Sequence, residues 1–300
     1  MPPSLSVSEF RDALGASKNI MILSGAGLSA PSGLATYRGS SSALWSNPAV
    51  VKYSQHTTFK DDSSGSWQFY HHRRLEALKA KPNEAHLALA ALNLPNVASR
   101  LIPAAVKPPL HVTQNIDELS LRAIELLPEP LADDAQKRLI QLHGSLFRTR
   151  CLSCRHEKHD HDPALAASLE GLDAETVVDI PIERLPRCGG DEWAGSNRYG
   201  RCGGLLRPDV VWFGEVPPLM GEVARTVSGC DLLIVVGTSA IVQPAAGLAS
   251  QVKSHGGKVA IFNIDRSNHD DQADYLFMGS CDVALPRVLG VEDDIKGLMP

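Results

Sequence analysis

The stretch KNIMILSGAGLSAPSG, residues 18–33, gives the first indication of the fold of this chain of 300 residues. It joins an apolar run, typical of a buried strand, to a turn rich in glycine and serine. Gly25 and Gly27 let the backbone turn sharply and approach a pyrophosphate, whose charge the N–H groups of a following helix can bind. Ala30 replaces the third glycine of the usual dinucleotide fingerprint, and no acidic residue stands clearly about 20 positions on. The motif alone therefore fits a dinucleotide site and a simple tight turn equally well.

Three further apolar runs predict buried strands, and helical patterns lie between them. The strands are PLHVTQN (109–115), CDLLIVVGTS (230–239) and GKVAIFNID (257–265), and the helices are 66–79, 83–92 with Asn83 as N-cap, 117–127 and 244–254. Strands that alternate with helices predict an α/β fold, with a parallel sheet covered by helices on both faces. Ligands bind such sheets beyond the carboxyl ends of the strands, which here read SGAG, TQNID, VGTS and FNID.

Composition excludes several classes of protein. The formal net charge of −5 does not favour nonspecific binding to nucleic acid. No apolar run approaches the length that spans a membrane. The first residues have no hydrophobic core of a secretion signal and are poor in arginine for a mitochondrial presequence. We leave the compartment open between mitochondrion and cytoplasm or nucleus.

Four of the six cysteines fall within one polar, glycine-rich segment, residues 151–207. They are Cys151, Cys154, Cys188 and Cys202. Because nothing indicates secretion, metal binding outranks disulfides. The C-x-x-C pair can wrap two thiolates around one zinc, and the other two cysteines could close a tetrahedral site. Such a site has no open position, so the zinc would be structural and would replace the core that this segment lacks.

The histidines of one hydrophilic run, and one histidine beside a glycine, have less certain roles. His156, His159 and His161 in HEKHDHD are rival zinc ligands, but so polar a run is more typical of a solvated loop. His143, in QLHGS, could act as a general base because its ordinary pKa lies near working pH. A lone histidine is more often structural, so residue type alone does not decide its role.

The chain carries, in order, GAGLSAPSGLATYRG, TQNID, LHG, the cysteine set, LLRPDVVWFGE, VVGTS and FNID. Together these motifs resemble the sirtuins, NAD-dependent protein-lysine deacylases, from about residue 20 to residue 289. The resemblance implies a Rossmann-like NAD-binding domain and a small zinc-binding domain. We predict these boundaries: 1–38, 83–150 and 208–300 for the large domain, 39–82 for the helical part of the small domain, and 151–207 for the zinc-binding module.

The resemblance also implies which residues bind NAD, around the diphosphate, the two riboses, the nicotinamide and the adenine. They are Gly25, Ala26, Gly27, Ser29, Arg38, Gln114, Asn115, Asp117, Gly237, Thr238, Ser239, Asn263, Asp265 and, through its backbone, Cys281. His143 and Asn115 match catalytic positions, with His143 the general base that deprotonates a ribose hydroxyl. Val211 and Phe213 would flank the acyl-lysine, whose peptide would pair with this segment as an added strand. The products would be free lysine, nicotinamide and O-acyl-ADP-ribose.

YHHRR, residues 70–74, matches the Tyr-x-x-Arg pair of the branch that removes succinyl, malonyl or glutaryl groups. A carboxylate in an apolar tunnel loses its hydration, and Arg73 and Tyr70 would replace it with charge-assisted hydrogen bonds. The motif GLATYR, with Thr36 where most sirtuins have Asp, also fits this branch, although Ala35 and Tyr37 depart from the family form. We expect Arg74 and the two histidines of YHHRR on a solvated helix face.

Three other functions remain open. The chain could be an NAD-dependent deacetylase, a mono-ADP-ribosyltransferase, or a noncatalytic module that binds NAD or acyl-lysine. Intact His143, Asn115 and Asp117 argue against the last. We expect acyl-lysine proteins as partners, no direct binding to nucleic acid or membrane, and a monomer.

Overall fold

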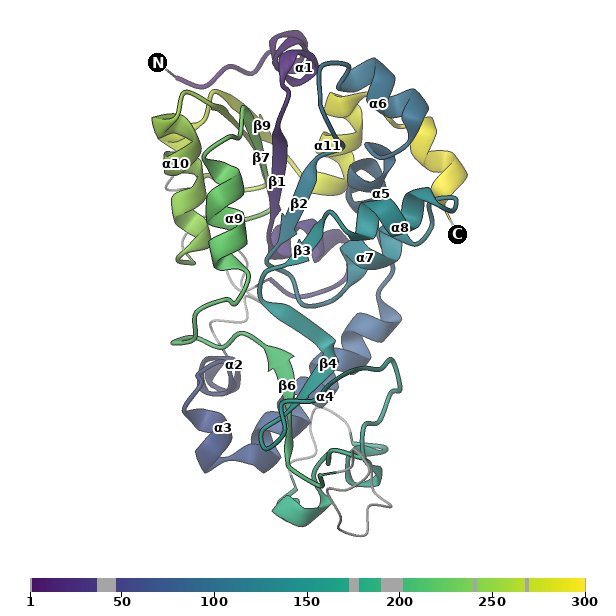
Figure 1. The fold of residues 1–300 in the computed structure, drawn as a ribbon, viewed down its shortest axis with the longest axis vertical. Helices are drawn as coiled ribbons and strands as arrows, with labels where there is room; N and C mark the ends of the chain where they lie inside the picture. Colours follow the sequence, from purple (N-terminus) through teal and green to yellow (C-terminus); the bar gives the residue numbers. More distant parts are fainter. Residues whose placement is uncertain are drawn as a thin grey trace.

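A six-stranded parallel sheet forms the core of the larger of two lobes in the computed structural model, which describes residues 2–36, 47–172, 178–189, 202–239, 242–267 and 270–299 (Figure 1). Its strand order is β3-β2-β1-β7-β8-β9. The strands are β1 (Ile20–Ser24), β2 (Leu110–Thr113), β3 (Leu139–Gln141), β7 (Leu232–Val236), β8 (Lys258–Asn263) and β9 (Tyr275–Met278). The predicted α/β fold class is confirmed, and each of the four predicted strands is present.

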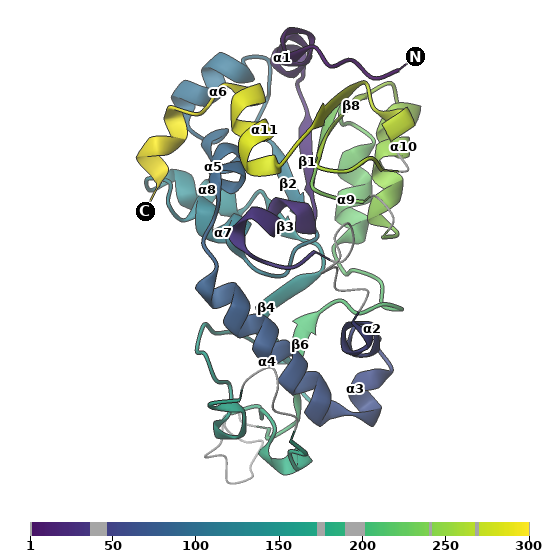
Figure 2. The same cartoon turned by 180° about the vertical axis from the view of Figure 1, so that it is seen from behind.

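Helices cover both faces of this sheet, as Figures 1 and 2 show from opposite sides. One face carries α1 (Val7–Ala16), α5 (Glu84–Ala91), α6 (Pro95–Leu101), α7 (Leu119–Ile124), α8 (Leu131–Gln136) and α11 (Cys281–Leu289), and the other carries α9 (Met220–Val227) and α10 (Leu248–Ser254). Within β1, Ile20 and Ile22 face the first set, and Met21 and Leu23 face the second. Because alternate residues of a strand point to opposite faces, an unbroken apolar run is what a doubly covered strand requires.

The smaller lobe lies at the carboxyl ends of the large sheet (Figure 1). It contains α2 (Pro48–Tyr53), α3 (Thr58–Asp61), α4 (Ser63–Lys79) and a three-stranded sheet in the order β5-β4-β6, formed by β4 (Gly144–Cys151), β5 (Glu157–His159) and β6 (Leu206–Val210). Its buried side chains include Trp67 of α4, Phe147 of β4 and Leu185 of the cysteine segment. The cysteine segment therefore packs against α4 to bury its few apolar side chains. The predicted domain boundaries stay a prediction.

Short 3-10 turns complete the chain and shape the strand ends. They are η1 (Ala26–Leu28), η2 (Ala30–Ser32), η4 (Ala167–Leu169), η5 (Ile182–Arg184), η7 (Ala245–Gly247), η8 (Asp270–Gln272) and η9 (Asp294–Leu298). The helix predicted after the glycine motif is thus two 3-10 turns. The helix predicted over 117–127 is shorter, because Glu118 takes a left-handed backbone conformation and α7 begins only at Leu119.

Asn83 caps α5 as predicted and also supports the glycine motif. Its side-chain oxygen accepts from the N–H groups of Ala85 (3.0 Å) and His86 (3.4 Å). Its amide nitrogen donates to the Leu28 carbonyl and to the Ser32 hydroxyl, both at 2.9 Å. One buried side chain therefore joins the start of α5 to the loop after β1.

Asn83→Ala should lower the free energy of unfolding by about 2–3 kcal/mol, because a cap contributes about 1 kcal/mol and each lost hydrogen bond a similar amount. Asn47→Ala is the matched control, since Asn47 caps α2 through a single bond to Ala49 N–H and is exposed. Urea unfolding measures both. Equal losses for the two variants would contradict the bridging role of Asn83.

Candidate active site

The carboxyl ends of the four predicted strands meet at one edge of the large sheet, facing the small lobe (Figure 2). The chain passes from β1 to β2 on one side, and β7 lies against β1 on the other. The loops after β1 and β7 therefore leave the sheet at a topological switch point, where α/β sheets bind ligands. SGAG, TQNID, VGTS and FNID all lie here.

The loops after β1 and β7 are in direct backbone contact. Gly27 N–H donates to the Gly237 carbonyl at 2.7 Å. A Cβ added at Gly27 would lie 2.7 Å from the Gly237 Cα, and one added at Gly237, where φ is 60°, would lie 2.3 Å from the Leu28 nitrogen. No side chain fits between two backbones so close together. The glycines are therefore required by the contact between loops, in addition to any ligand they bind.

Asn115 joins the loop after β2 to the loop after β1. Its buried amide donates to the Gly25 carbonyl and to the Ser29 hydroxyl, both at 3.0 Å. Asp117 is also buried, accepts from Leu119 N–H at 2.9 Å, and burial raises the pKa of its carboxyl group. Three predicted site residues, Ser29, Asn115 and Asp117, thus lie together.

His143 lies between the strand ends and the small lobe, directly before β4. Its Nδ1 lies 3.1 Å from the Gln114 carbonyl, which can only accept, so Nδ1 carries the proton and Nε2 has a free lone pair. Burial lowers the pKa of His143 below its ordinary value of 6.5, although the bond to Gln114 opposes this shift. The imidazole is therefore neutral near pH 7, with one nitrogen able to accept a proton.

The loops after β7 and β8 bring the remaining predicted residues to the same edge. Thr238 Oγ1 lies 3.4 Å from the Gln114 amide nitrogen, and the Thr238 carbonyl accepts from Asn263 at 3.2 Å. Ser239 is half-buried, whereas Asp265 is exposed. Arg38 and Tyr37 lie outside the described residues.

Cys281 begins α11, close to η1. Its side chain is 3% exposed, and burial raises the pKa of its thiol to about 12. The thiol is therefore protonated at neutral pH, and its Sγ lies 3.9 Å from the Phe262 carbonyl, while the start of α11 lies close to η1. This geometry agrees with a backbone role.

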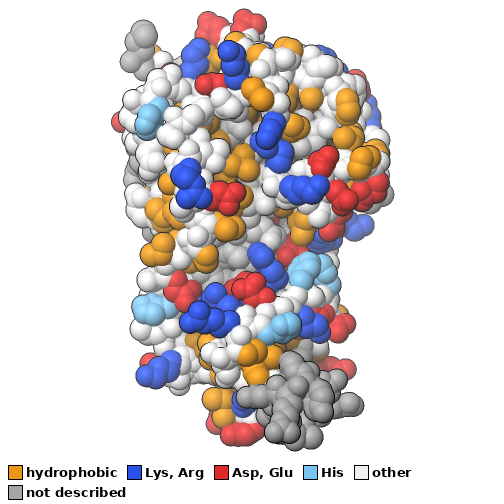
Figure 3. Space-filling view, viewed as in Figure 1, with side chains coloured by type: hydrophobic (Ala, Val, Ile, Leu, Met, Phe, Trp, Pro, Cys, Tyr) orange, Lys and Arg blue, Asp and Glu red, His pale blue; other side chains and the backbone are white. Residues whose placement is uncertain are grey.

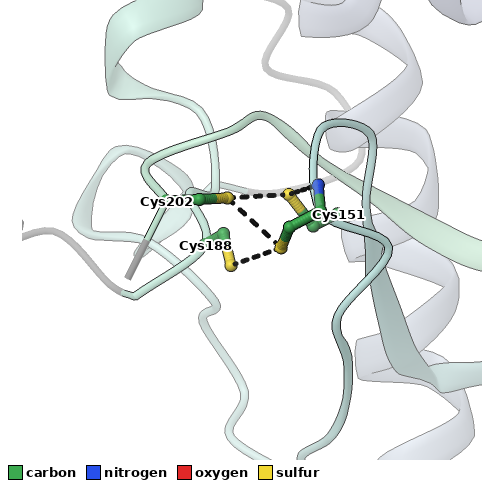
Figure 4. A group of neighbouring side chains, drawn as sticks. Cys151, Cys188 and Cys202 are labelled. Atoms are coloured by element: carbon green, nitrogen blue, oxygen red, sulfur yellow. Dashed lines mark hydrogen bonds between the residues drawn. The ribbon is translucent and has the colours of Figure 1, made fainter. Parts of the chain in front are cut away.

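The four clustered cysteines meet at the end of β4 as a sulfur cluster (Figure 4). The Sγ atoms of Cys202 lie 3.3 Å from those of both Cys151 and Cys154, and Cys154 lies 3.7 Å from Cys188. Tetrahedral zinc with bonds of about 2.3 Å would separate its sulfurs by about 3.8 Å. The cluster therefore fits a four-sulfur zinc site after a slight expansion.

Backbone N–H groups donate to two of these sulfurs and would stabilise them as thiolates. Those of Ser153 and Cys154 point at Cys151 Sγ, at 3.4 and 3.5 Å, and that of Gly204 points at Cys202 Sγ at 3.4 Å. Burial alone would raise the pKa of Cys151, but these donors and the neighbouring thiols lower it to about 7. Such turns supply the charge-assisted bonds that orient metal ligands.

The two arginines of YHHRR have different surroundings on α4. Arg74 is 1% exposed and donates to the carbonyls of Asp162 (2.8 Å), Leu146 (3.0 Å) and Asp160. The expectation that it lies on a solvated face is wrong, and so is that for His71, which is 3% exposed. Both side chains pack inward because α4 crosses over β4 and the loop after β5.

Arg73 and Tyr70 lie on the same helix, where Arg73 is half-buried and Tyr70 is buried. The Arg73 side chain is 16% exposed, and its charge acts on Asp117. The Tyr70 hydroxyl accepts from the Trp212 indole at 2.8 Å and donates to the Tyr53 carbonyl at 3.2 Å. Arg73 thus lies within electrostatic reach of the strand-end site, and Tyr70 contacts the VVWFGE segment.

This arrangement of strand-end loops, histidine and four cysteines matches known proteins over nearly the whole chain. The Sir2 family model matches residues 25–244. The chain belongs to the Sir2 family.

Its relatives include the mitochondrial NAD-dependent protein deacylase sirtuin-5A of Xenopus laevis, 38% identical over 96% of this chain and 86% of the relative. An NAD-dependent protein deacylase of Daphnia pulex is 35% identical over 96% and 97% of the two chains. Among solved structures, a Sir2 homologue in complex with NAD has a TM-score of 0.73 and 31% identity, covering 100% of this chain and 98% of that one.

The segment after β6 connects the Sir2 site to the small lobe. Val211 N–H donates to the His143 carbonyl at 2.9 Å, and Phe213 N–H donates to the Ser54 carbonyl at 2.8 Å. Trp212 N–H donates to Glu215 at 3.0 Å. Since these three donors are bonded within the chain, a peptide strand added here would have to use other backbone groups.

Arg207 holds this segment, and sequence reasoning assigned it no role. Its guanidinium makes two bonds to Glu215, of 2.6 and 2.9 Å, and lies 3.6 Å from the centre of the Trp212 ring. Arg207 and Glu215 both belong to the motif LLRPDVVWFGE, eight residues apart. Nothing in the motif indicated a turn that would bring the two side chains together.

No helix in the described ranges is long and apolar enough to cross a membrane.

Cys154→Ser should reduce the zinc content from one equivalent to near zero and destabilise the small lobe, because three sulfurs no longer close the site. Elemental analysis after dialysis against a weak chelator measures this, with thermal unfolding as a second readout. Cys230→Ala is the control, since that thiol is buried elsewhere and donates to the Leu232 carbonyl. A full equivalent of zinc in Cys154→Ser would contradict the assignment.

Proposed function

We propose that this chain is an NAD-dependent protein-lysine deacylase that prefers acyl groups ending in a carboxylate. The observation that carries the reaction is the neutral His143, whose Nδ1–H is fixed on the Gln114 carbonyl beside the buried Asn115 and Asp117. The names of the relatives, NAD-dependent protein deacylases at 38% and 35% identity, support the reaction class.

The strand-end loops have the groups that NAD requires. Small residues at 25–27 and 237–239 would let the diphosphate approach the backbone closely, although the N–H groups of Gly25, Gly27 and Gly237 are bonded within the chain. The start of α11 adds a favourable dipole for the diphosphate. Asn115 and Asp117 would bind the nicotinamide end, since both are polar groups held in the buried loop after β2. When bound, NAD would supply the ribose carbon that receives the acyl oxygen and releases nicotinamide.

His143 would remove the proton of a ribose hydroxyl. Its Nε2 is the acceptor, because Nδ1 is bonded to Gln114, and burial keeps the ring neutral. The products would be deacylated lysine, nicotinamide and O-acyl-ADP-ribose. Val211 and Phe213 would lie along the lysine stem, because their backbones join the His143 loop to the small lobe.

Arg73 would set the acyl preference. A carboxylate that leaves water needs a charged partner, and a guanidinium supplies two parallel donors. Arg73 is half-buried on α4, and its Nε lies 3.9 Å from the exposed carboxylate of Glu76. Its charge also acts on Asp117, so the guanidinium lies within electrostatic reach of the site. The Tyr70 hydroxyl already bonds Trp212 and the Tyr53 carbonyl, so its proton would have to turn from Tyr53 to the substrate. We therefore rank Arg73 above Tyr70.

Arg73→Met should lower kcat/KM for a succinyl-lysine peptide by about 10- to 150-fold, mainly through KM, because a bond to a charged group contributes about 1.5–3 kcal/mol. Weak deacetylation should persist or rise, and Tyr70→Phe should cost less than Arg73→Met. Steady-state kinetics with succinyl and acetyl peptides measures these changes.

The matched control is Lys79→Met, which removes a cation from the exposed end of α4. It should leave both activities unchanged. Equal loss of both activities in Arg73→Met would count against the acidic preference, and a wild-type enzyme that favours acetyl peptide would make it a deacetylase.

The acidic limb of the pH profile of kcat/KM should have its midpoint below 6.5. The base works when neutral, that is, above its pKa, and burial lowers the pKa of His143 from 6.5. Activity should thus be retained at a lower pH than an exposed histidine would allow. His143→Tyr should abolish turnover while the protein stays folded. A midpoint above 6.5, or turnover by His143→Tyr, would remove His143 from this role.

A further inference from the structure

A second group of metal-ligating side chains lies outside the sulfur cluster. It consists of Glu118, His159 and His161, and we call it the His–Glu cluster. Glu118 Oε2 lies 3.0 Å from His159 Nε2 and 3.1 Å from His161 Nε2, and Oε1 lies 3.1 Å from His159 Nε2. Two imidazoles thus meet one carboxylate, although HEKHDHD was expected to be a solvated loop.

The distances fit a divalent ion with nitrogen and oxygen ligands. Tetrahedral zinc, with bonds of about 2.0–2.1 Å to histidine and carboxylate, separates its ligand atoms by about 3.3 Å. The carboxylate–imidazole separations of 3.0 and 3.1 Å need only a small expansion. Two histidines and one glutamate form a three-ligand set that leaves a fourth position for water.

The carboxylate of the cluster is buried and the two imidazoles are partly exposed, as expected for a metal site with one position open to solvent. The Glu118 side chain is 1% exposed, whereas those of His159 and His161 are 44% and 48% exposed. A buried carboxylate at the base would contribute its negative charge in a poorly hydrated place, and the exposed imidazoles would give an ion access from solvent. Figure 3 shows histidine side chains at the surface of the small lobe and near its junction with the sheet lobe.

The surroundings hold Glu118 and His161 in place. The Ser145 hydroxyl donates to Glu118 Oε1, and the His161 ring lies 4.8 Å from that of Phe147. Buried Arg74 donates to the Asp160 and Asp162 carbonyls, on either side of His161. Partners of this kind orient the ligands of known metal sites. The loop that carries both histidines is therefore anchored.

The backbone of Glu118 gives an independent observation. Its φ of 60° lies in the left-handed region, which non-glycine residues occupy at a cost of about 1–2 kcal/mol. Glu118 directly follows the TQNID motif, and its conformation keeps α7 from beginning before Leu119. A strained residue with a buried carboxylate that receives two imidazoles and a hydroxyl is typical of a site held for a ligand.

The charged side chains around the His–Glu cluster determine whether a cation would be attracted to it. Arg74 is the cation beside Glu118. Burial lowers the pKa of its guanidinium, and its attraction to Asp160, Glu118 and Asp162 opposes this shift only in part. Lys158 is bonded to Asp160 at 2.6 Å and its side chain is 63% exposed. Among these groups of the described chain, the carboxylates of Glu118, Asp160 and Asp162 outnumber the cations Arg74 and Lys158 by one. A divalent ion would enter a locally negative site.

We propose that Glu118, His159 and His161 form a second metal site, which binds a divalent ion of the zinc type with one position open to solvent. Glu118 follows Asp117 in the loop after β2, whereas both histidines belong to the small lobe. The ion would therefore tie the Asp117 loop to the hairpin of β4 and β5. The proposal does not depend on the deacylase function, because metal binding is measured without NAD or peptide.

The test starts from protein that holds one zinc per chain in the sulfur cluster, established by elemental analysis. Titration with Zn²⁺ in a non-chelating buffer, followed by calorimetry, should reveal one further equivalent. His161→Ala and His159→Ala should each weaken this binding by at least about tenfold, since even partners that only orient ligands change affinity by about 10–100-fold. Glu118→Gln, which keeps the shape but removes the charge, should do the same.

His156→Ala is the matched control, because His156 is exposed, belongs to the same hairpin and lies outside the cluster. It should bind the second equivalent as the wild type does. Added Zn²⁺ should raise the melting temperature of the wild type and of His156→Ala but not that of His161→Ala. A wild type that binds only one zinc, or a second equivalent that both His159→Ala and His161→Ala retain, would overturn the proposal.

Discussion

The contact between the Gly27 N–H and the Gly237 carbonyl, at 2.7 Å, is the constraint on which the rest of the site depends. It brings the loops after β1 and β7 together at the switch point of the sheet. Asn115 then ties in the loop after β2, and Asn263 ties in the loop after β8. Because only glycine allows two backbones to come this close, the sequence of these loops is restricted before any ligand is considered.

The helix α4 and the segment after β6 connect this edge to the small lobe. Trp212 bonds Tyr70 and stacks with Arg207, so the VVWFGE segment, α4 and β6 form one packed unit. Arg74 fixes the loop that carries His161, and Arg73, one residue earlier, acts on Asp117. Successive side chains of a helix point about 100° apart. Arg74 can therefore bind the loop of the small lobe while Arg73 lies closer to Asp117.

The sequence predicted those features that depend on residues close together along the chain. Strands β1, β2, β7 and β8 were predictable because their apolar runs are continuous, and the four cysteines because their spacing and polar surroundings have one main interpretation. Strands β3 and β9, at the two edges of the large sheet, and the small-lobe strands β4, β5 and β6 were not predicted. The apolar runs of β3 and β9 are short, and charged residues interrupt β4, β5 and β6. Most residues of the predicted NAD site follow strand ends, and their roles were implied by the resemblance to the sirtuins.

Other features depend on partners far along the chain. Arg74 was expected in solvent because its acceptors lie 72 to 88 residues away, where no local pattern indicates them. His159 and His161 were interpreted as a solvated loop because Glu118 precedes them by 41 and 43 residues. Long-range pairs of polar groups are decided by the packing of the lobes, which spacing alone does not predict.

The most direct measurement of the central claim is a competition in one vessel. Equimolar succinyl- and acetyl-lysine forms of one peptide are mixed with enzyme and NAD, and mass spectrometry follows both peptides and the ADP-ribose product. We predict that the succinyl form is consumed first, with one O-succinyl-ADP-ribose formed for each lysine released and no reaction without NAD. Consumption of the acetyl form at an equal or greater rate, or lysine release without the ADP-ribose ester, would contradict the account.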